Sequence, residues 1–217
     1  AVFLSLQVSA VATICALPLA IWVAHVLARK QFRGHGLLNG LVHLPLVLPP
    51  VVTGYLLLIV FGKQGAVGGF LYDWFGITLA FRWTGAALAA AIMGFPLMVR
   101  AIRLGFEAVD AGLEDAARTL GASRARVFGT VTLPLVMPAI LAGAVLGFAK
   151  ALGEFGATIT FVAAIPGQTQ TIPSAIYGLL QVPNQESDVI VLVSISVALA
   201  MGALVASEWL ARRMVAR

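Results

Sequence analysis

Long apolar stretches alternate along the chain with short segments that hold most of its polar residues. An α-helix needs roughly 20 residues to cross about 30 Å of hydrocarbon at 1.5 Å per residue. The stretches that meet this length, and that we assign as membrane spans, cover about residues 2–28, 41–61, 84–104, 134–153 and 189–211. The pattern therefore predicts an all-α membrane protein in which residues 1–217 form a single transmembrane domain with five spans.

Three segments outside these spans are also partly apolar. The run Phe155–Ile165 is too short to cross a membrane alone, so we expect a re-entrant or capping element there. Residues 62–82 and 166–188 mix glycine, proline and polar residues with short apolar pieces, and we expect small helices lying at the membrane interface. Pro173 would fit the first turn of the second of these helices.

Prolines and small residues shape the predicted spans. Each proline inside a span frees a backbone carbonyl, which either marks a protein-lined path or reflects the general tolerance of membrane helices for proline. These prolines are Pro45, Pro49, Pro50, Pro96, Pro134 and Pro138. Small residues at four-residue spacing predict close packing of helices. They are Ala86, Ala90, Gly143, Gly147 and Ala151.

Composition narrows the functional class. With 60% hydrophobic residues, 11% charged residues and a mean hydropathy of +0.99, the chain does not fit a soluble domain. The single cysteine, Cys15, lies inside a predicted span and offers neither a disulfide nor a thiolate cluster. The sequence lacks the HExxH, GxSxG and phosphate-binding GxxxxGK[ST] motifs, so we expect no catalytic site, no metal site and no cofactor bound by this chain.

The distribution of basic residues predicts the orientation in the membrane. Most of them fall in three segments that five spans would place on one side, and basic loops face the cytoplasm. They are Arg29, Lys30, Arg33, Arg100, Arg103, Arg118, Arg124, Arg126, Arg212, Arg213 and Arg217. We therefore expect an external N-terminus and a cytoplasmic C-terminus. The net charge of +5 is explained by the basic residues on the cytoplasmic side and does not indicate nucleic-acid binding. Because the chain begins at Ala1 rather than at methionine, we also expect a few native residues to precede it.

A polar segment of the predicted cytoplasmic side, residues 114–134, carries the clearest local signals. Asp110 is placed to cap a short helix, and Glu114 and Asp115 then lie in its first turn, where the helix dipole favours anions. Glu114 and Arg118 are four residues apart in the order that favours an ion pair. A short amphipathic helix is therefore predicted to begin after Asp110.

The same cytoplasmic loop, assigned to residues 105–133, is predicted to continue as a glycine joint and a second short helix. The residues behind this prediction are Leu113, Ala116, Ala117 and Leu120 in the first helix, Gly121 at the joint, and Ser123 and Arg124 at the start of the second helix. Leu113, Ala117 and Leu120 share one stripe, and glycine suits a helix exit. The alanines are small enough to let another surface approach closely.

The spacing of this loop resembles the EAA loop of ABC importer permeases. The matching residues are Asp115, Ala116, Ala117, Gly121, Val131, Leu133 and Pro134. The first is aspartate rather than glutamate, with Glu114 directly before it, and neither carboxylate is assigned a role alone. The resemblance implies that residues Glu114–Arg124 form the coupling helix that docks into a groove of an ATPase subunit. The alternative is an ordinary amphipathic loop between two spans.

Further segments are similar to molybdate ABC transporter permeases. They are residues 41–55, 71–77, 95–104, 152–161 and 171–177, in the same order as in that family, although the Gly-Glu-Phe-Gly piece is also similar to sulfate permeases. The resemblance implies a homodimer of two five-span cores, two cytoplasmic ATPase subunits that hold ATP and Mg²⁺, and an external oxyanion-binding protein. It also implies a location in the inner (plasma) membrane of a prokaryote.

Lys150 and Glu154 are the ionisable residues placed deepest in the predicted membrane region, one helical turn apart. One interpretation is a structural ion pair in which each charge neutralises the other. The other is that Lys150 makes the electrostatic potential of the path more favourable for a dianion, while Glu154 limits this effect. Glycines with approachable backbone and hydroxyl side chains follow, which suit an oxyanion path. The candidate pore or gate residues are Lys150, Gly153, Glu154, Phe155, Gly156 and Thr158.

Together these observations predict a permease subunit that imports molybdate by ATP-driven alternating access. The substrate would meet a path rather than a tight site, because no cluster of convergent donors stands out in the sequence. One alternative keeps the machine and changes the cargo to sulfate, tungstate or another tetrahedral oxyanion. Another is an ATP-independent transporter or channel. The sequence of such a protein would be expected to contain an inverted repeat and several carboxylates deep in the membrane, whereas only Glu154 is placed deep here.

Overall fold

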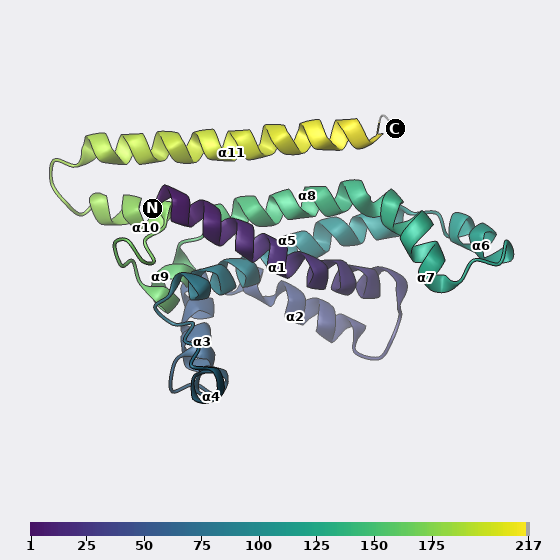
Figure 1. Ribbon diagram of the computed structural model, residues 1–217, viewed down its shortest axis with the longest axis horizontal. Coiled ribbons are helices and arrows are strands. Elements are labelled where there is room, and N and C mark those ends of the chain that lie inside the picture. Colours follow the sequence, from purple (N-terminus) through teal and green to yellow (C-terminus); the bar gives the residue numbers. More distant parts are fainter. Residues whose placement is uncertain (216–217) are drawn as a thin grey trace.

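The computed structural model describes residues 1–215, and this part of the chain is helical without strands. Four long helices form the body of the molecule (Figure 1). They are α1 (Val2–Arg29), α5 (Trp83–Ala108), α8 (Leu133–Leu152) and α11 (Glu186–Val215). Within the described residues, four helices are long and apolar enough to cross a membrane, so the all-α membrane class predicted from the sequence is confirmed.

The long helices place the polar connections at one end of the body. Helices α1, α5 and α11 run in one direction and α8 runs in the other (Figure 1). The connection after α1, the short helices α6 (Ala111–Thr119) and α7 (Arg124–Val127) and the C-terminal end of α11 therefore meet at the end opposite the N-terminus. The basic segments around Arg29 and Arg118 thus share one end of the molecule, while the predicted Arg217 lies outside the described residues.

The second predicted span, 41–61, is two helices rather than one. Helix α2 (His35–Val47) and helix α3 (Pro50–Phe61) meet at an angle of 112°. Leu48 and Pro49 adopt extended backbone with ψ of 142° and 134°, because a residue before proline disfavours the helical region and two prolines follow in sequence. The predicted interruption is therefore a sharp corner, and α2 and α3 are long and apolar enough to cross a membrane only when they are taken together.

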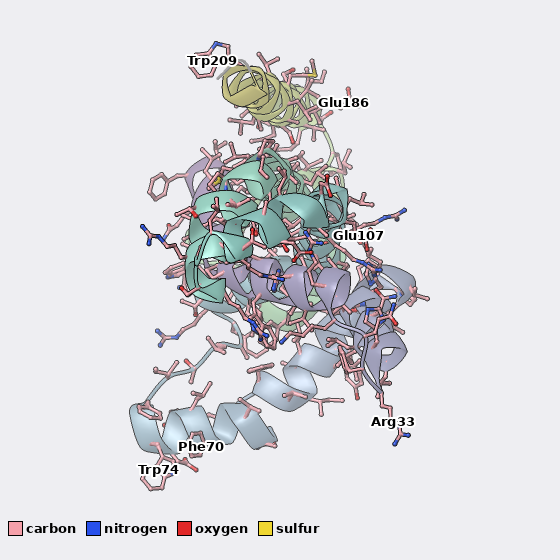
Figure 2. The ribbon with its side chains drawn as sticks, turned by 90° about the vertical axis from the view of Figure 1, so that its right-hand side faces the viewer. Arg33, Phe70, Trp74, Glu107, Glu186 and Trp209 are labelled. Carbon is pink, nitrogen blue, oxygen red and sulfur yellow. The ribbon has the colours of Figure 1, made fainter. Side chains whose placement is uncertain are left out.

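Helix α3 leads into an arm that projects from the body. Helix α4 (Ala66–Phe75) follows α3 and lies at the outer end of this arm (Figure 1). Figure 2 shows Phe70 and Trp74 of α4 on this arm, well away from the long helices. Trp74 is 75% exposed, as expected for an aromatic residue at a membrane interface.

Small residues allow α5 and α8 to pack closely. Ala86 and Ala90 of α5 are buried, and the glycines of α8 lie directly against larger side chains of α5. A Cβ atom on Gly147 would lie 2.6 Å from the side chain of Met98, and one on Gly143 would lie 2.9 Å from Ile102 Cγ1. The packing role predicted for these small residues is therefore confirmed.

Two short helices complete the end of the body that holds the N-terminus. Helix α9 (Gly156–Val162) packs against α3 and α5, and accounts for the predicted element within 155–165. Helix α10 (Ile172–Leu179) has proline in its first turn, as predicted, and the Ser5 hydroxyl accepts the Ile172 N–H at 2.7 Å. Helices α4 and α10 confirm the expectation of short helices in the two outer segments.

The loop predicted to be cytoplasmic, 105–133, is shorter in the structure, because residues at both of its ends belong to helices. Its first residues, up to Ala108, belong to α5, and a π-helical turn, η1 (Phe128–Thr132), leads directly into α8. Leu133 N–H donates to Phe128 O, five residues earlier, and Pro134 follows without an N–H of its own. The part of the loop outside the long helices is therefore α6, its joint and α7.

Candidate coupling site

Helix α6 is fixed at both ends by local interactions. The Asp110 side chain accepts the Gly112 N–H at 2.8 Å, which satisfies one of the free donors at the start of the helix. At the other end Gly121 has φ of +86°, and the N–H groups of Gly121 and Ala122 donate to Arg118 O and Ala117 O. This is a Schellman motif, and it confirms the predicted glycine exit.

The second short helix follows as predicted. The Ser123 hydroxyl accepts the Arg126 N–H at 3.4 Å and caps α7, which begins at Arg124. Val127, at the end of α7, is buried, whereas α6 contains no buried residue. The arrangement of helix, glycine joint and helix is therefore confirmed, with α7 attached to the body and α6 standing outside it.

Helix α6 presents an apolar stripe to its surroundings. Leu113 is 50% exposed, and Leu120, which directly follows the last helical residue Thr119, is 89% exposed. Ala117, the third member of the predicted stripe, is half-buried, whereas the neighbouring Ala116 is exposed. Figure 1 shows α6 beyond the ends of α5 and α8, at the outer edge of the described part of the chain. A small apolar stripe on a protruding helix is suited to the groove of another protein.

The two neighbouring carboxylates of α6 have different environments. Glu114 turns inward: its side chain is 12% exposed, its Oε1 accepts the Thr132 hydroxyl at 2.7 Å, and the Arg29 Nη2 lies 3.2 Å away. Asp115 turns outward, is 68% exposed and pairs only with Arg118 at 3.0 Å. The predicted Glu114–Arg118 pair is also present, at 3.8 Å. The structure thus separates two carboxylates that the sequence could not rank.

Arg29 and Thr132 are the residues that sequence reasoning missed at this site. Arg29 ends α1 and lies 85 positions before Glu114, and we used it only to predict orientation. Thr132 lies 18 positions after Glu114 and is 2% exposed. No local signal in the sequence identifies either residue, since no pattern along the chain pairs them with Glu114.

Lys150 and Glu154 form a pair at the opposite end of α8. The Lys150 ammonium donates to Glu154 Oε2 at 2.5 Å, and the second carboxylate oxygen accepts the Ala157 N–H at 3.0 Å. Glu154 is 3% exposed, and the Lys150 side chain is 29% exposed. Glu154 therefore accepts hydrogen bonds both from Lys150 and from a free backbone N–H in the first turn of α9. The second of these roles was not predicted from the sequence.

The other candidate pore residues surround this pair. Gly153 ends α8 and is exposed, and the Phe155 ring lies 5.0 Å from the Tyr177 ring. A Cβ atom on Gly156 would lie 2.6 Å from Pro50 Cβ, so α9 begins in tight contact with α3. Thr158 is 3% exposed and faces the interior of the chain. The assignment of these residues to a pore or gate stays a prediction.

Residues 16–216 match the family described as "binding-protein-dependent transport system inner membrane component". The chain belongs to this family. As such an inner membrane component, it is a membrane protein that acts in transport rather than as an enzyme. Among the described residues there is also no group of three or more histidine, cysteine, aspartate or glutamate side chains that could hold a metal ion.

Two curated relatives and one solved structure illustrate the similarity of this inner membrane component to known proteins. It is 62% identical to the molybdenum transport system permease protein ModB of Escherichia coli (strain K12), over 98% of this chain and 93% of that protein. It is 55% identical to the protein of the same name in Haemophilus influenzae, over 99% of this chain and 93% of that protein. In fold it is similar to the MetNI methionine ABC transporter in inward-facing form, with a TM-score of 0.77 at 15% identity, over 98% of this chain and 93% of that one.

Proposed function

We propose that this chain is the permease subunit of an importer that moves molybdate into the cell, driven by ATP hydrolysis in a separate subunit. The observation that carries this proposal is the 62% identity, over 98% of the chain, to a molybdenum transport permease. Two copies of the chain form the membrane unit, an external oxyanion-binding protein delivers the substrate, and two ATPase subunits bind at the end that holds α6. In this orientation the N-terminus is external and the C-terminus is cytoplasmic.

The ATPase acts on this chain through α6. Its exposed stripe, with Leu113 and Leu120, enters a groove of the ATPase, and the Schellman joint at Gly121 holds the angle between α6 and α7. Helix α7 continues through η1 into α8, whose far end carries Lys150 and Glu154. Movement of the ATPase subunits thus reaches the opposite end of the body along one chain of helices.

Molybdate is a tetrahedral dianion, and its passage requires that fixed charges along the route neither trap nor repel it. The pairing of Lys150 with Glu154 leaves no net charge at the end of α8. Gly153 adds exposed backbone beside the pair. These features support a path that an oxyanion passes briefly, with the selection of the substrate left to the binding protein.

Reconstitution tests the proposal directly. Proteoliposomes containing the permease, its ATPase subunit and its oxyanion-binding protein are expected to take up molybdate only when ATP is present. Uptake of molybdate, tungstate and sulfate would be compared, each with a binding protein that is loaded with that anion. Uptake without ATP would indicate an ATP-independent transporter. Uptake of sulfate alone would show that the transported anion is sulfate rather than molybdate.

Gly121→Pro is expected to uncouple the ATPase. Proline cannot adopt φ of +86°, and the substitution also removes the N–H that donates to Arg118 O. Substrate-stimulated ATP hydrolysis and uptake should both fall by more than about tenfold, since the joint behind the docking helix is lost. The helical content, measured by circular dichroism, should stay the same because Gly121 lies outside the long helices.

Gly129→Ala is the matched control for the joint. Gly129 lies a few residues further on, in η1, and a Cβ atom there would meet nothing within 4 Å. Alanine at this position should leave hydrolysis and uptake near the wild-type values. If the Gly121→Pro complex also kept normal substrate-stimulated hydrolysis and uptake, the assignment of α6 as the coupling helix would be wrong.

The isolated homodimer is expected to bind neither ATP nor molybdate with useful affinity. The sequence lacks a phosphate-binding loop, and the proposed path lacks a tight substrate site. Isothermal titration calorimetry on the detergent-purified homodimer should therefore show no saturable heat with either ligand. Micromolar binding of molybdate would instead reveal a true substrate site in this chain.

A further inference from the structure

The environment of Glu114 points to a role that differs from contact with a partner. Its carboxylate is the meeting point of three structural elements: Arg29 at the end of α1, Thr132 in η1 and Arg118 in α6. Two of these partners, Arg29 and Thr132, bind the same oxygen, Oε1, at 3.2 and 2.7 Å. With a side-chain exposure of 12%, Glu114 is directed toward its own chain and away from the apolar stripe of α6.

Arg29 extends this junction to the end of α5. The Nη2 atom that contacts Glu114 also donates to Val109 O at 3.3 Å, in the residue directly after α5. Arg29 Nε is buried without a hydrogen-bond partner, so the guanidinium depends on Glu114 and Val109 for its interactions. Arg29 is partly buried, with a side-chain exposure of 22%, so the loss of its carboxylate partner would be costly and favours retention of this contact.

Aromatic packing surrounds the same junction. His25 lies one turn before Arg29 on α1, and its ring meets Phe106 of α5 edge-on at 5.0 Å and Phe128 of η1 at 5.3 Å. Phe106 and Phe128 are themselves stacked, with centroids 6.4 Å apart. Helices α1 and α5 and the start of α8 are therefore held together directly beside the point where Glu114 attaches α6.

We propose that Glu114 and Arg29 form a tether that transmits movement of the coupling helix α6 to α1 and α5, in addition to the covalent route through α7 and α8. In this arrangement Glu114 does not contact the ATPase. Movement of α6 carries the Glu114 carboxylate with it, and the shared Oε1 draws the end of α1 and η1 in the same direction. Glu114 and Arg29 are positioning residues, and the inference rests on the proposed function because it names how the same site works.

A double-mutant cycle tests the tether in the complete complex. Glu114→Gln, Arg29→Met and the double variant would be compared with Glu107→Gln, which makes the same change in the exposed Arg103–Glu107 pair within α5. The readout is the number of anions imported per ATP hydrolysed, with whichever oxyanion the wild-type complex imports. Simple loss of folded protein lowers uptake and hydrolysis together and leaves this ratio unchanged.

The tether predicts a fall in the coupling ratio of roughly fivefold or more in each single variant. The double variant should be no worse than either single variant, because both remove the same contact. Glu107→Gln should keep the wild-type ratio. Wild-type ratios in both single variants, or additive losses in the double variant, would overturn the tether while leaving the proposed function intact.

A second measurement tests the tether without any substrate. Hydrogen exchange on the homodimer should show faster exchange of the α6 amides in Glu114→Gln than in wild type, because α6 is released from α1. The α6 amides of Glu107→Gln should exchange like those of wild type. Unchanged exchange in Glu114→Gln would overturn the tether whatever the cargo is, whereas failure of the uptake assay in wild type alone would count against the proposed function.

Discussion

Glu154→Leu is expected to prevent assembly of a stable permease. Leucine removes the acceptor of the Ala157 N–H at the start of α9, worth about 1 kcal/mol for a helix cap. It also leaves the Lys150 ammonium without its partner, which costs up to about 3 kcal/mol because that side chain is only 29% exposed. The yield of folded protein from detergent and its midpoint of thermal unfolding should both fall clearly below wild type.

Two related variants separate the functions of this pair. Glu154→Gln keeps an acceptor for the Ala157 N–H but removes the charge, so it should be milder than leucine. The double change Lys150→Met with Glu154→Gln removes both charges and should recover assembly if the pair is structural. Lost uptake in a well-folded double variant would favour a role in anion passage. Normal uptake in Glu154→Gln, in Lys150→Met and in the double variant would remove the pair from the list of path residues.

Gly54→Leu is expected to separate α3 from α9 and abolish uptake. A Cβ atom at this position would lie 2.5 Å from Ala157 O and 2.9 Å from Thr160 Cβ, and the first of these atoms belongs to backbone that cannot move aside. Overpacking of this kind costs about 3 kcal/mol or more. Thermal unfolding of the purified protein and ATP-driven uptake would both report the loss.

Gly40→Leu is the matched control for this substitution. Gly40 lies in α2, and a Cβ atom there would meet nothing within 4 Å. Leucine favours a helix more than glycine does, so this variant should unfold at or above the wild-type temperature. If Gly54→Leu behaved in the same way, the close contact between α3 and α9 would not be a requirement of the fold.

The parts of the fold that could be predicted from the sequence depend on neighbours a few residues apart. Asp110 and Ser123 cap helices through donors two and three residues ahead, and Gly121 ends α6 through bonds to the preceding turn. Such signals are visible in any short window of sequence. Long apolar stretches likewise report the length of a span without reference to other helices.

The remaining features depend on distances in space that the sequence does not encode locally. The Arg29–Glu114 contact joins residues 85 positions apart, and the contact of Gly54 with Ala157 joins two helices, α3 and α9, that are far apart in the sequence. The prolines at 49 and 50 predict a break, but the angle of 112° follows from what α3 packs against. Similarly, Glu154 could be placed near Lys150 by spacing, but not on the first turn of α9.

The opposite directions of Glu114 and Asp115 give helix α6 two kinds of sensitivity to ionic strength. The Asp115–Arg118 pair is exposed to solvent, so its attraction weakens as the salt concentration rises and the Debye length falls below about 8 Å. The Glu114–Arg29 pair, with exposures of 12% and 22%, is screened much less. Helix α6 is therefore expected to stay attached to the body of the molecule as salt concentration rises, while the Asp115–Arg118 pair on its outer face weakens.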